Sequence, residues 1–270
     1  MIQTESLTLG YRDNVIINHL NIEIPKGKIT IFVGANGCGK STLLRSLARL
    51  LKPMAGTVRL AEDELQQLST KTIAKKLAVL PQSASSPEGI TVQQLVKQGR
   101  YPHQSLLQQW SVEDEQVVNE AMASTGVKHL ADRTIASLSG GQRQRAWIAM
   151  TLAQRTEILL LDEPTTFLDV AHQIEILDLC HTLNEMEGKT VVIVLHDLNL
   201  AARYADHMIA LKDQTVYAEG KPEQVVTPEM MRAVFSLECE VIPDPVTGTP
   251  MTIPYGKKAI RRNDVRTLAR

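Results

Sequence analysis

The chain has 270 residues, of which 29 are Lys or Arg and 30 are Asp or Glu, so its formal net charge is −1. This balance excludes a global electrostatic attraction to nucleic acid, and an aromatic fraction of 4% leaves few side chains on which single-stranded bases could stack. A hydrophobic fraction of 43% suits a globular domain with a sizeable core, but no apolar run approaches the roughly 20 residues that cross a bilayer.

The three cysteines, Cys38, Cys180 and Cys239, lie far apart in the sequence. No C-x-x-C pair is present, which excludes a zinc knuckle and a disulfide framework and favours a reducing, intracellular compartment. The first residues lack the basic start and apolar run of a signal peptide. If the protein works at a membrane, we expect another chain to span it.

The first strands are predicted by alternating and β-branched segments. Residues 2–9 alternate, residues 14–24 contain two short apolar runs, and residues 29–33 form a continuous run typical of a buried strand. Tyr11 falls in the short polar turn after the first segment. It could stack on an adenine ring or be an ordinary half-buried turn tyrosine, and the local sequence favours neither.

A phosphate-binding loop follows the strand of residues 29–33. Residues 34–42 have the sequence GANGCGKST, which fits G-x-x-x-x-G-K-[ST], and residues 41–51 have apolar side chains at a helical spacing. Strand, glycine-rich turn and helix are the context that the motif requires. The sequence therefore predicts a phosphate site formed by Gly34, Ala35, Asn36, Gly37, Cys38, Gly39, Lys40, Ser41 and Thr42.

The chemistry of this loop assigns roles to its residues. Glycines let the backbone approach phosphates closely, and the first N–H groups of the following helix carry the positive end of its dipole. Lys40 is expected to reach the β- and γ-phosphates, and the Ser41 hydroxyl to bind Mg²⁺. Cys38 is interpreted as a small filler, because no base lies beside it in the sequence.

The chain continues with a predicted strand at residues 57–60, a helix at residues 69–76 and a buried strand at residues 77–80. Gln82 follows where this last strand gives way to a polar loop. A lone glutamine at such a position is either a functional side chain or an ordinary loop residue.

Residues 88–137 have helical rather than strand periodicity. Thr91 can cap a helix that runs to residue 97, residues 99–103 break it, and Ser111 with Asp114 resembles a capping box for a helix through about residue 124. We interpret this part as an all-helical insertion in an α/β chain.

Residues 138–145, LSGGQRQR, open a helix that we expect to run to about residue 153. Ser139 is a good N-cap, and the glycines after it leave the first N–H groups exposed, which makes a second candidate anion site. Since the first loop already serves one nucleotide, this one is inferred to meet a nucleotide held by a partner chain. The alternative is a plain glycine turn before a capped helix.

Two later strands end in polar residues. Residues 157–162 form an apolar strand that ends in Asp162, which would hold Mg²⁺ through water, and Glu163 would be the base or polariser for an attacking water. A strand at residues 190–195 ends before His196, which either contacts a γ-phosphate or is a structural histidine.

The remaining elements are predicted from periodicity and turns: helices at residues 170–185, 198–204 and 228–235 and a closing hairpin at residues 208–218. A Pro-rich stretch follows, and residues 257–270 are basic. Such an end is either a solvated tail or a contact with anionic lipid.

This set of motifs resembles the ATP-binding subunit of an ABC transporter over roughly residues 2–220. It comprises the phosphate loop, a glutamine after the VLP strand, LSGGQ, ILLLDEP, a loop ending in Leu168 and Asp169, and the histidine of LHD. The family implies an α/β P-loop NTPase core with an antiparallel β subdomain and an inserted α-helical subdomain. We assign residues 1–87 and 138–220 to the core, 88–137 to the helical subdomain and 221–270 to a C-terminal extension.

The resemblance also implies how the chain acts. The family binds and hydrolyses ATP with Mg²⁺ as a head-to-tail homodimer, and each nucleotide lies between the phosphate loop of one subunit and the LSGGQ segment of the other. In that arrangement Gln82 senses Mg²⁺ and the permease, and His196 contacts the γ-phosphate. The other implied site residues are Tyr11 on adenine, Asp169 linking the two sites, and Ser139, Gly140, Gly141 and Gln142 on the nucleotide of the partner.

The loop before Asp169 departs from the family pattern, because TTFLD at residues 165–169 lacks the usual serine and alanine. With GRYPH at residues 99–103 and HDLNLAARYAD at residues 196–206, it resembles the ATPases of ferric-siderophore, heme and cobalamin importers, iron–siderophore uptake most of all. This implies a separate integral membrane permease, a periplasmic or extracellular solute-binding protein, and a peripheral location on the cytoplasmic face of the inner (cell) membrane.

Two other functions were weighed against this one. An ABC ATPase that acts on nucleic acid generally carries a coiled-coil insertion, a zinc module or a second cassette, none of which appears in the sequence, so no nucleic-acid partner is expected. A nucleotide-binding module without turnover is opposed by the intact set of Lys40, Asp162, Glu163 and His196.

Overall fold

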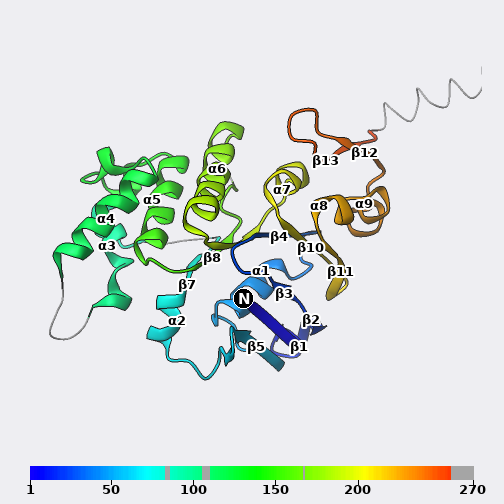
Figure 1. Ribbon diagram of the computed structural model, residues 1–270, viewed down its shortest axis with the longest axis horizontal. Helices are drawn as coiled ribbons and strands as arrows, with labels where there is room; N and C mark the ends of the chain where they lie inside the picture. Colours follow the sequence, from blue (N-terminus) through cyan, green and yellow to red (C-terminus); the bar gives the residue numbers. More distant parts are fainter. Residues whose placement is uncertain (83–85, 105–109, 167, 257–270) are drawn as a thin grey trace, which may run out of the picture.

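A six-stranded sheet forms the centre of the protein in the computed structural model, which describes residues 1–82, 86–104, 110–166 and 168–256 (Figure 1). The strand order is β11–β10–β4–β9–β8–β7. Neighbouring strands from β10 to β7 are parallel, and β11 pairs antiparallel with β10. The strands are β4 (Ile29–Gly34), β7 (Leu77–Leu80), β8 (Ile158–Asp162), β9 (Thr190–Val194), β10 (His207–Lys212) and β11 (Thr215–Gly220).

The apolar sequence of these strands explains their position. β4, β8 and β9 are buried along their whole length, as expected when both faces of a parallel sheet are covered. The predicted strands at residues 29–33, 77–80, 157–162 and 190–195 are confirmed to within one residue. The predicted hairpin at residues 208–218 is also confirmed, but its first strand additionally pairs with β4 and so belongs to the central sheet.

A second, antiparallel sheet is built around β1 (Ile2–Tyr11). Tyr11 was predicted in the turn, which is wrong: it is the last residue of β1 and lies opposite Asn14, and the turn is made by residues 12–13, where Arg12 has a φ of +53°. The other strands are β2 (Asn14–Leu20), β3 (Glu23–Ile24), β5 (Ala55–Leu60) and β6 (Asp63–Glu64).

Helix α1 (Lys40–Leu47) packs between the two sheets, because Leu43, Leu44 and Leu47 share a hydrophobic core with residues of both. We predicted this helix to continue to residue 51, and it stops four residues earlier. Arg49 adopts a left-handed φ of +57°, and the N–H of Leu50 bonds to the carbonyl of Arg45 at 2.8 Å. This closure of the last turn ends the helix even though the apolar spacing continues.

The helices α3 (Val92–Gln98), α4 (Val112–Ser124) and α5 (Gly140–Ala153) pack together beside the sheet (Figure 1). All three predicted N-caps are confirmed, and each forms a full capping box: Thr91 with Gln94, Ser111 with Asp114, and Ser139 with Gln142. Helix α2 (Thr70–Lys76) precedes β7 and is capped by Ser69. Among the helices in the described ranges, none has the length and hydropathy needed to cross a bilayer.

A buried ion pair joins these helices. The Nε of Arg100 donates to Asp114 at 2.7 Å and its Nη1 to the carbonyl of Ala153 at 2.9 Å. Replacing Arg100 by alanine is expected to lower the free energy of unfolding by about 3 kcal/mol, because it leaves a buried carboxylate without its cation. Urea unfolding followed by the fluorescence of Trp110 and Trp147 measures this.

The paired replacement is the control for this prediction. Arg100→Met combined with Asp114→Leu should cost less stability than Arg100→Ala, because no buried charge is left alone. A single variant as stable as the wild type would show that the pair does not hold the helices.

Residues 221–256 fold as two short helices and a hairpin. The Pro-rich stretch lies in the hairpin of β12 (Cys239–Pro243) and β13 (Pro250–Pro254), whose prolines lie at strand ends where a missing N–H is tolerated. Residues 257–270, predicted as a basic tail, lie outside the described ranges. The other helices are α6 (Val170–Glu187), α7 (Leu198–Tyr204), α8 (Pro222–Val225) and α9 (Pro228–Phe235).

The hairpin is fastened to α7 by polar contacts. Asn199 Oδ1 accepts from the N–H of Thr252 at 2.8 Å and from its hydroxyl at 2.9 Å, and Arg203 donates to Asp244 at 2.6 Å. The bond from Arg203 and the N–H of Val246 lower the pKa of Asp244 from its ordinary 3.8 to about 2. Since the folded pKa lies below the unfolded one, this contact stabilises the fold above about pH 4 and is lost as the pH falls toward 2.

Asp244→Asn is therefore expected to be less stable than the wild type at neutral pH, and the difference should shrink as the pH is lowered to about 3. Urea unfolding midpoints of both proteins at several pH values measure this. Asp213→Asn, which alters an exposed carboxylate in the turn between β10 and β11, is the control. A difference that stays constant with pH would contradict the assignment.

Candidate active site

The phosphate loop connects the carboxyl end of β4 to the amino end of α1. Gly34, Gly37 and Gly39 have left-handed φ values of +148°, +80° and +103°. A Cβ at Gly39 would lie 2.8 Å from Ile17 Cδ1, so both backbone conformation and space require glycine there. Gly39 is also the N-cap of α1 and provides no side-chain cap, which leaves the first N–H groups of the helix available to an anion.

Two residues of the loop reach inward. The Nζ of Lys40 is buried and donates to the carbonyls of Gly34 at 2.8 Å and Ala35 at 3.0 Å, so the ammonium group lies within the loop itself. The Ser41 hydroxyl donates to Asp162 Oδ1 at 2.7 Å, across 121 positions of sequence. The predicted Mg²⁺ residues Ser41 and Asp162 are thus neighbours.

Asp162 lies at the end of β8 with only 1% of its surface exposed. Burial raises the pKa of its carboxyl group and the negative charge of Glu163 adds to this, while the bond from Ser41 and the charges of Arg45 and Lys40 act in the opposite direction. A bound divalent cation would favour the charged form of this carboxylate, which the protein alone disfavours.

Glu163 is held by donors from three separate segments. Its Oε1 lies 2.7 Å from His196 Nε2, and its Oε2 accepts from Gln82 Nε2 at 2.6 Å and from Thr166 Oγ1 at 3.0 Å. Burial raises the pKa of Glu163, but these hydrogen bonds and the charge of His196 outweigh it and hold the pKa below its ordinary value. Its backbone has a left-handed φ of +52°, which is strained for a non-glycine residue.

Lys40, Ser41, Glu163 and His196 line one cleft of about 280 Å³ at the carboxyl edge of the sheet. Asp162 and Gln82 do not line the cleft, but each is hydrogen-bonded to a residue that does: Asp162 to Ser41, and Gln82 to Glu163. Ala35 and Cys38 line a neighbouring cleft of about 530 Å³, which α9 also borders. The smaller cleft is lined by Ile16, Asn36, Gly37, Gly39, Lys40, Ser41, Thr42, Glu163 and His196.

The profile of the ABC transporter family matches residues 17–166, more than half of the chain and most of this cleft. The chain belongs to the ABC transporter family. This confirms the predicted fold class and the resemblance on which it was based.

Individual relatives extend the match to nearly the whole chain. YusV of Bacillus subtilis (strain 168), described as a probable siderophore transport system ATP-binding protein, is 62% identical over 95% of this chain and 93% of its own length. The petrobactin import ATP-binding protein FpuD of Bacillus anthracis is 59% identical over 98% of this chain and 97% of its own. The dimeric structure of MJ0796, a bacterial ABC transporter cassette, superposes with a TM-score of 0.73 at 30% identity and covers 82% of this chain and 98% of that one.

Several predicted residues of this ABC protein do not line the cleft. Tyr11 is 46% exposed and contributes nothing to the lining, whereas Ile16 from β2 of the same hairpin does. Ser139, Gly140, Gly141 and Gln142 form the first turn of α5, where Ser139 and Gln142 cap each other. Asp169 is the N-cap of α6. A single chain therefore brings together only part of the predicted set.

Two residues in these contacts had no predicted role. Thr166 belongs to the TTFLD segment that departs from the family pattern, which was the only sequence signal for its bond to Glu163. Ile16 is an apolar strand residue like many others, so no local signal could have placed it in the cleft.

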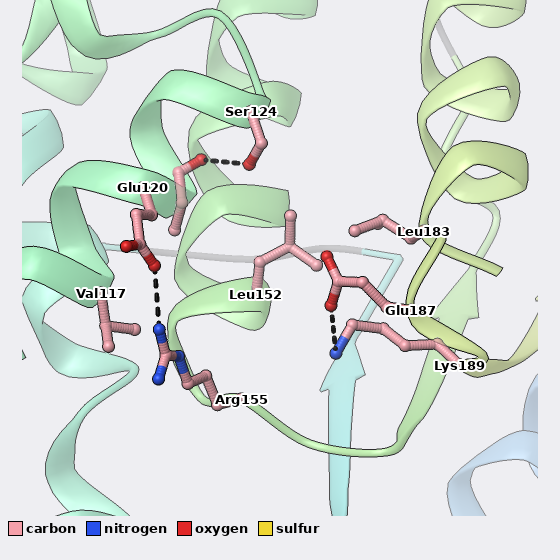
Figure 2. Close-up of a pocket in the computed structure, with 9 residues that line it drawn as sticks. Val117, Glu120, Ser124, Leu152, Arg155, Leu183, Glu187 and Lys189 are labelled. Carbon is pink, nitrogen blue, oxygen red and sulfur yellow. Dashed lines mark hydrogen bonds and ion pairs between the residues drawn. The ribbon is translucent and has the colours of Figure 1, made fainter. Parts of the chain in front are cut away.

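A further cleft of about 480 Å³ lies between α4, the end of α5 and the C-terminal end of α6, and is also lined by Arg155 and Lys189 (Figure 2). Each of its walls carries its own ion pair, Arg155 with Glu120 at 2.9 Å and Lys189 with Glu187 at 3.1 Å. Its charges are therefore satisfied within the chain, and no predicted site residue lines it.

Proposed function

We propose that the chain is the ATP-binding and hydrolysing subunit of an importer for iron(III)–siderophore complexes, working with a separate membrane permease. The observation that carries the enzymatic part is the position of Glu163, which is contacted by His196, Gln82 and Thr166 and lies next to the Ser41–Asp162 pair. The cargo is supported by YusV and FpuD, whose names refer to siderophore and petrobactin transport at 62% and 59% identity.

The residues of the cleft and those bonded to them have separate roles in hydrolysis of the phosphate bond. Lys40 and the N–H groups of α1 hold the β- and γ-phosphates, and His196 contacts the γ-phosphate. Glu163 takes the proton of the attacking water, since its carboxylate has acceptor capacity beyond the three bonds it already makes. Gln82, which donates to Glu163, lies on the segment that leads to the helical part. We therefore assign this bond the role of coupling ATP turnover to the permease.

Ser41 and Asp162 would hold Mg²⁺. Hydroxyl and carboxylate oxygens are the donors that this ion prefers, and bound Mg²⁺ neutralises charge on the phosphate oxygens. Within the described residues no group of three or more His, Cys, Asp or Glu side chains is arranged to hold a metal. These two oxygens therefore suit an ion that takes its remaining ligands from phosphate and water.

The residues outside the cleft act in a head-to-tail homodimer. Ser139, Gly140, Gly141 and Gln142 contact the nucleotide of the second copy, Asp169 links the two sites, and Tyr11 stacks on adenine. The dimeric cassette MJ0796 supports this assembly. The importer assignment implies a membrane permease, a solute-binding protein and a peripheral location on the cytoplasmic face of the inner membrane. We also propose that residues 1–87 and 138–220 form the ATPase core, 88–137 the helical subdomain and 221–270 the C-terminal extension.

Uptake measurements test the cargo. Cells from which the gene for this chain has been deleted should lose uptake of radiolabelled iron–siderophore, and the wild-type gene but not a Glu163→Gln gene should restore it. Loss of heme or cobalamin uptake instead would identify one of those cargoes. Unchanged uptake of all three, together with salt-dependent binding of DNA or RNA measured by anisotropy, would favour an ABC ATPase of the nucleic-acid class.

A further inference from the structure

Asp169, the N-cap of α6, is held by a side chain of its own helix. Its Oδ1 accepts from the backbone N–H of His172 at 3.0 Å and lies 2.7 Å from His172 Nδ1. The backbone bond is the usual N-cap contact, but the ring bond is additional and depends on histidine. The carboxylate of Asp169 is thus oriented by the residue three positions further along.

The same histidine ring lies against the first turn of α5. A Cβ at Gly141 would be 2.8 Å from His172 Cδ2, 3.2 Å from Cγ and 3.3 Å from Nε2. The backbone of Gly141 is helical and does not itself require glycine. The ring is therefore what excludes a larger residue at this position.

A second contact joins the same two helices further along, where Arg145 of α5 forms an ion pair with Glu175 of α6. The two contacts lie on one side of α6, because residues 172 and 175 are three positions apart. His181, the other histidine of α6, faces elsewhere: it lies 3.4 Å from Glu185 and packs edge-on against Tyr204.

We propose that His172 is a positioning residue that fixes Asp169 and the LSGGQ turn of α5 in one relative arrangement. This rests on the proposed dimer, in which both segments face the nucleotide of the second copy. Because the His172 ring is bonded to Asp169 and packed on Gly141, these two segments approach the nucleotide of the second copy as a unit. His172 is not among the residues that line the 280 Å³ cleft of its own chain.

The variants His172→Ala, His172→Phe and His172→Asn test this. Phenylalanine keeps a ring on Gly141 and loses the bond to Asp169, whereas asparagine keeps an N–H donor and loses the ring. His172→Ala should lower kcat for ATP by about 10- to 10²-fold, because a misplacement of about 1 Å can cost up to 10²-fold, and the other two should fall between it and the wild type. The affinity of each monomer for a fluorescent ATP analogue should stay unchanged.

ATP-driven dimerisation supplies the second readout. In a Glu163→Gln background, His172→Ala should raise the protein concentration needed for the ATP-bound dimer, measured by light scattering. His181→Ala is the matched control, since it removes another carboxylate-paired histidine from the same helix. If the Glu163→Gln protein dimerises with ATP and all three His172 variants in that background behave like His181→Ala, the inference is wrong. If that background itself fails to dimerise with ATP, the proposed function fails instead.

The packing contact can be tested separately by thermal unfolding of the monomer. Gly141→Ala should lower the melting temperature because its methyl group meets the ring, and adding His172→Ala should recover part of that loss. A double variant whose losses simply add would show that the ring does not occupy this space.

Discussion

Glu163→Gln is expected to lower ATP turnover by about 10²–10⁴-fold while ATP binding stays close to that of the wild type. Glutamine has the same shape and keeps an acceptor for Gln82, Thr166 or His196, but it cannot take a proton from water. The measurement is phosphate release at saturating MgATP, with binding of a fluorescent ATP analogue measured in parallel.

The other end of the same strand provides the control for that prediction. Glu157→Gln changes an exposed carboxylate just before β8, which is paired with Lys26 at 3.8 Å, and should leave turnover unchanged. If Glu163→Gln turned over ATP as fast as the wild type, Glu163 would not be the base. The assigned role of the cleft would then be limited to binding.

Lys40→Ala is expected to weaken ATP binding by about 100-fold, because a charge-assisted hydrogen bond to the phosphates is lost. ATP turnover should fall together with the affinity, at any attainable ATP concentration. Titration with the fluorescent analogue measures the affinity, and circular dichroism checks that the loop still folds without the bonds to Gly34 and Ala35.

Lys52→Ala, an exposed lysine shortly after α1, is the control and should bind ATP as the wild type does. Lys40→Arg should not restore full binding, because the guanidinium group is larger and planar and the loop is built around a compact ammonium. Normal affinity in Lys40→Ala would mean that the N–H groups of α1 hold the phosphates without it.

Local patterns were sufficient wherever neighbouring residues decide the conformation. Thr91, Ser111 and Ser139 were identified as caps because capping depends on residues three positions apart, and all three cap their helices. Apolar spacing alone was wrong at the end of α1, which stops at Leu47 because Arg49 is left-handed. The bond that ends α1 runs from the N–H of Leu50 to the carbonyl of Arg45, and the apolar spacing of the side chains does not report this backbone turn.

The strands, the capped helices, the phosphate loop and the family resemblance were determined by the sequence alone, because apolar periodicity and turn chemistry are properties of short segments. Only the tertiary structure decided that Gln82, Thr166 and His196 meet on Glu163, and that His172 joins Asp169 to Gly141. Parallel strand pairing brings the ends of distant segments to one edge of the sheet, and helix packing sets two separate N-termini side by side. No single segment contains that information.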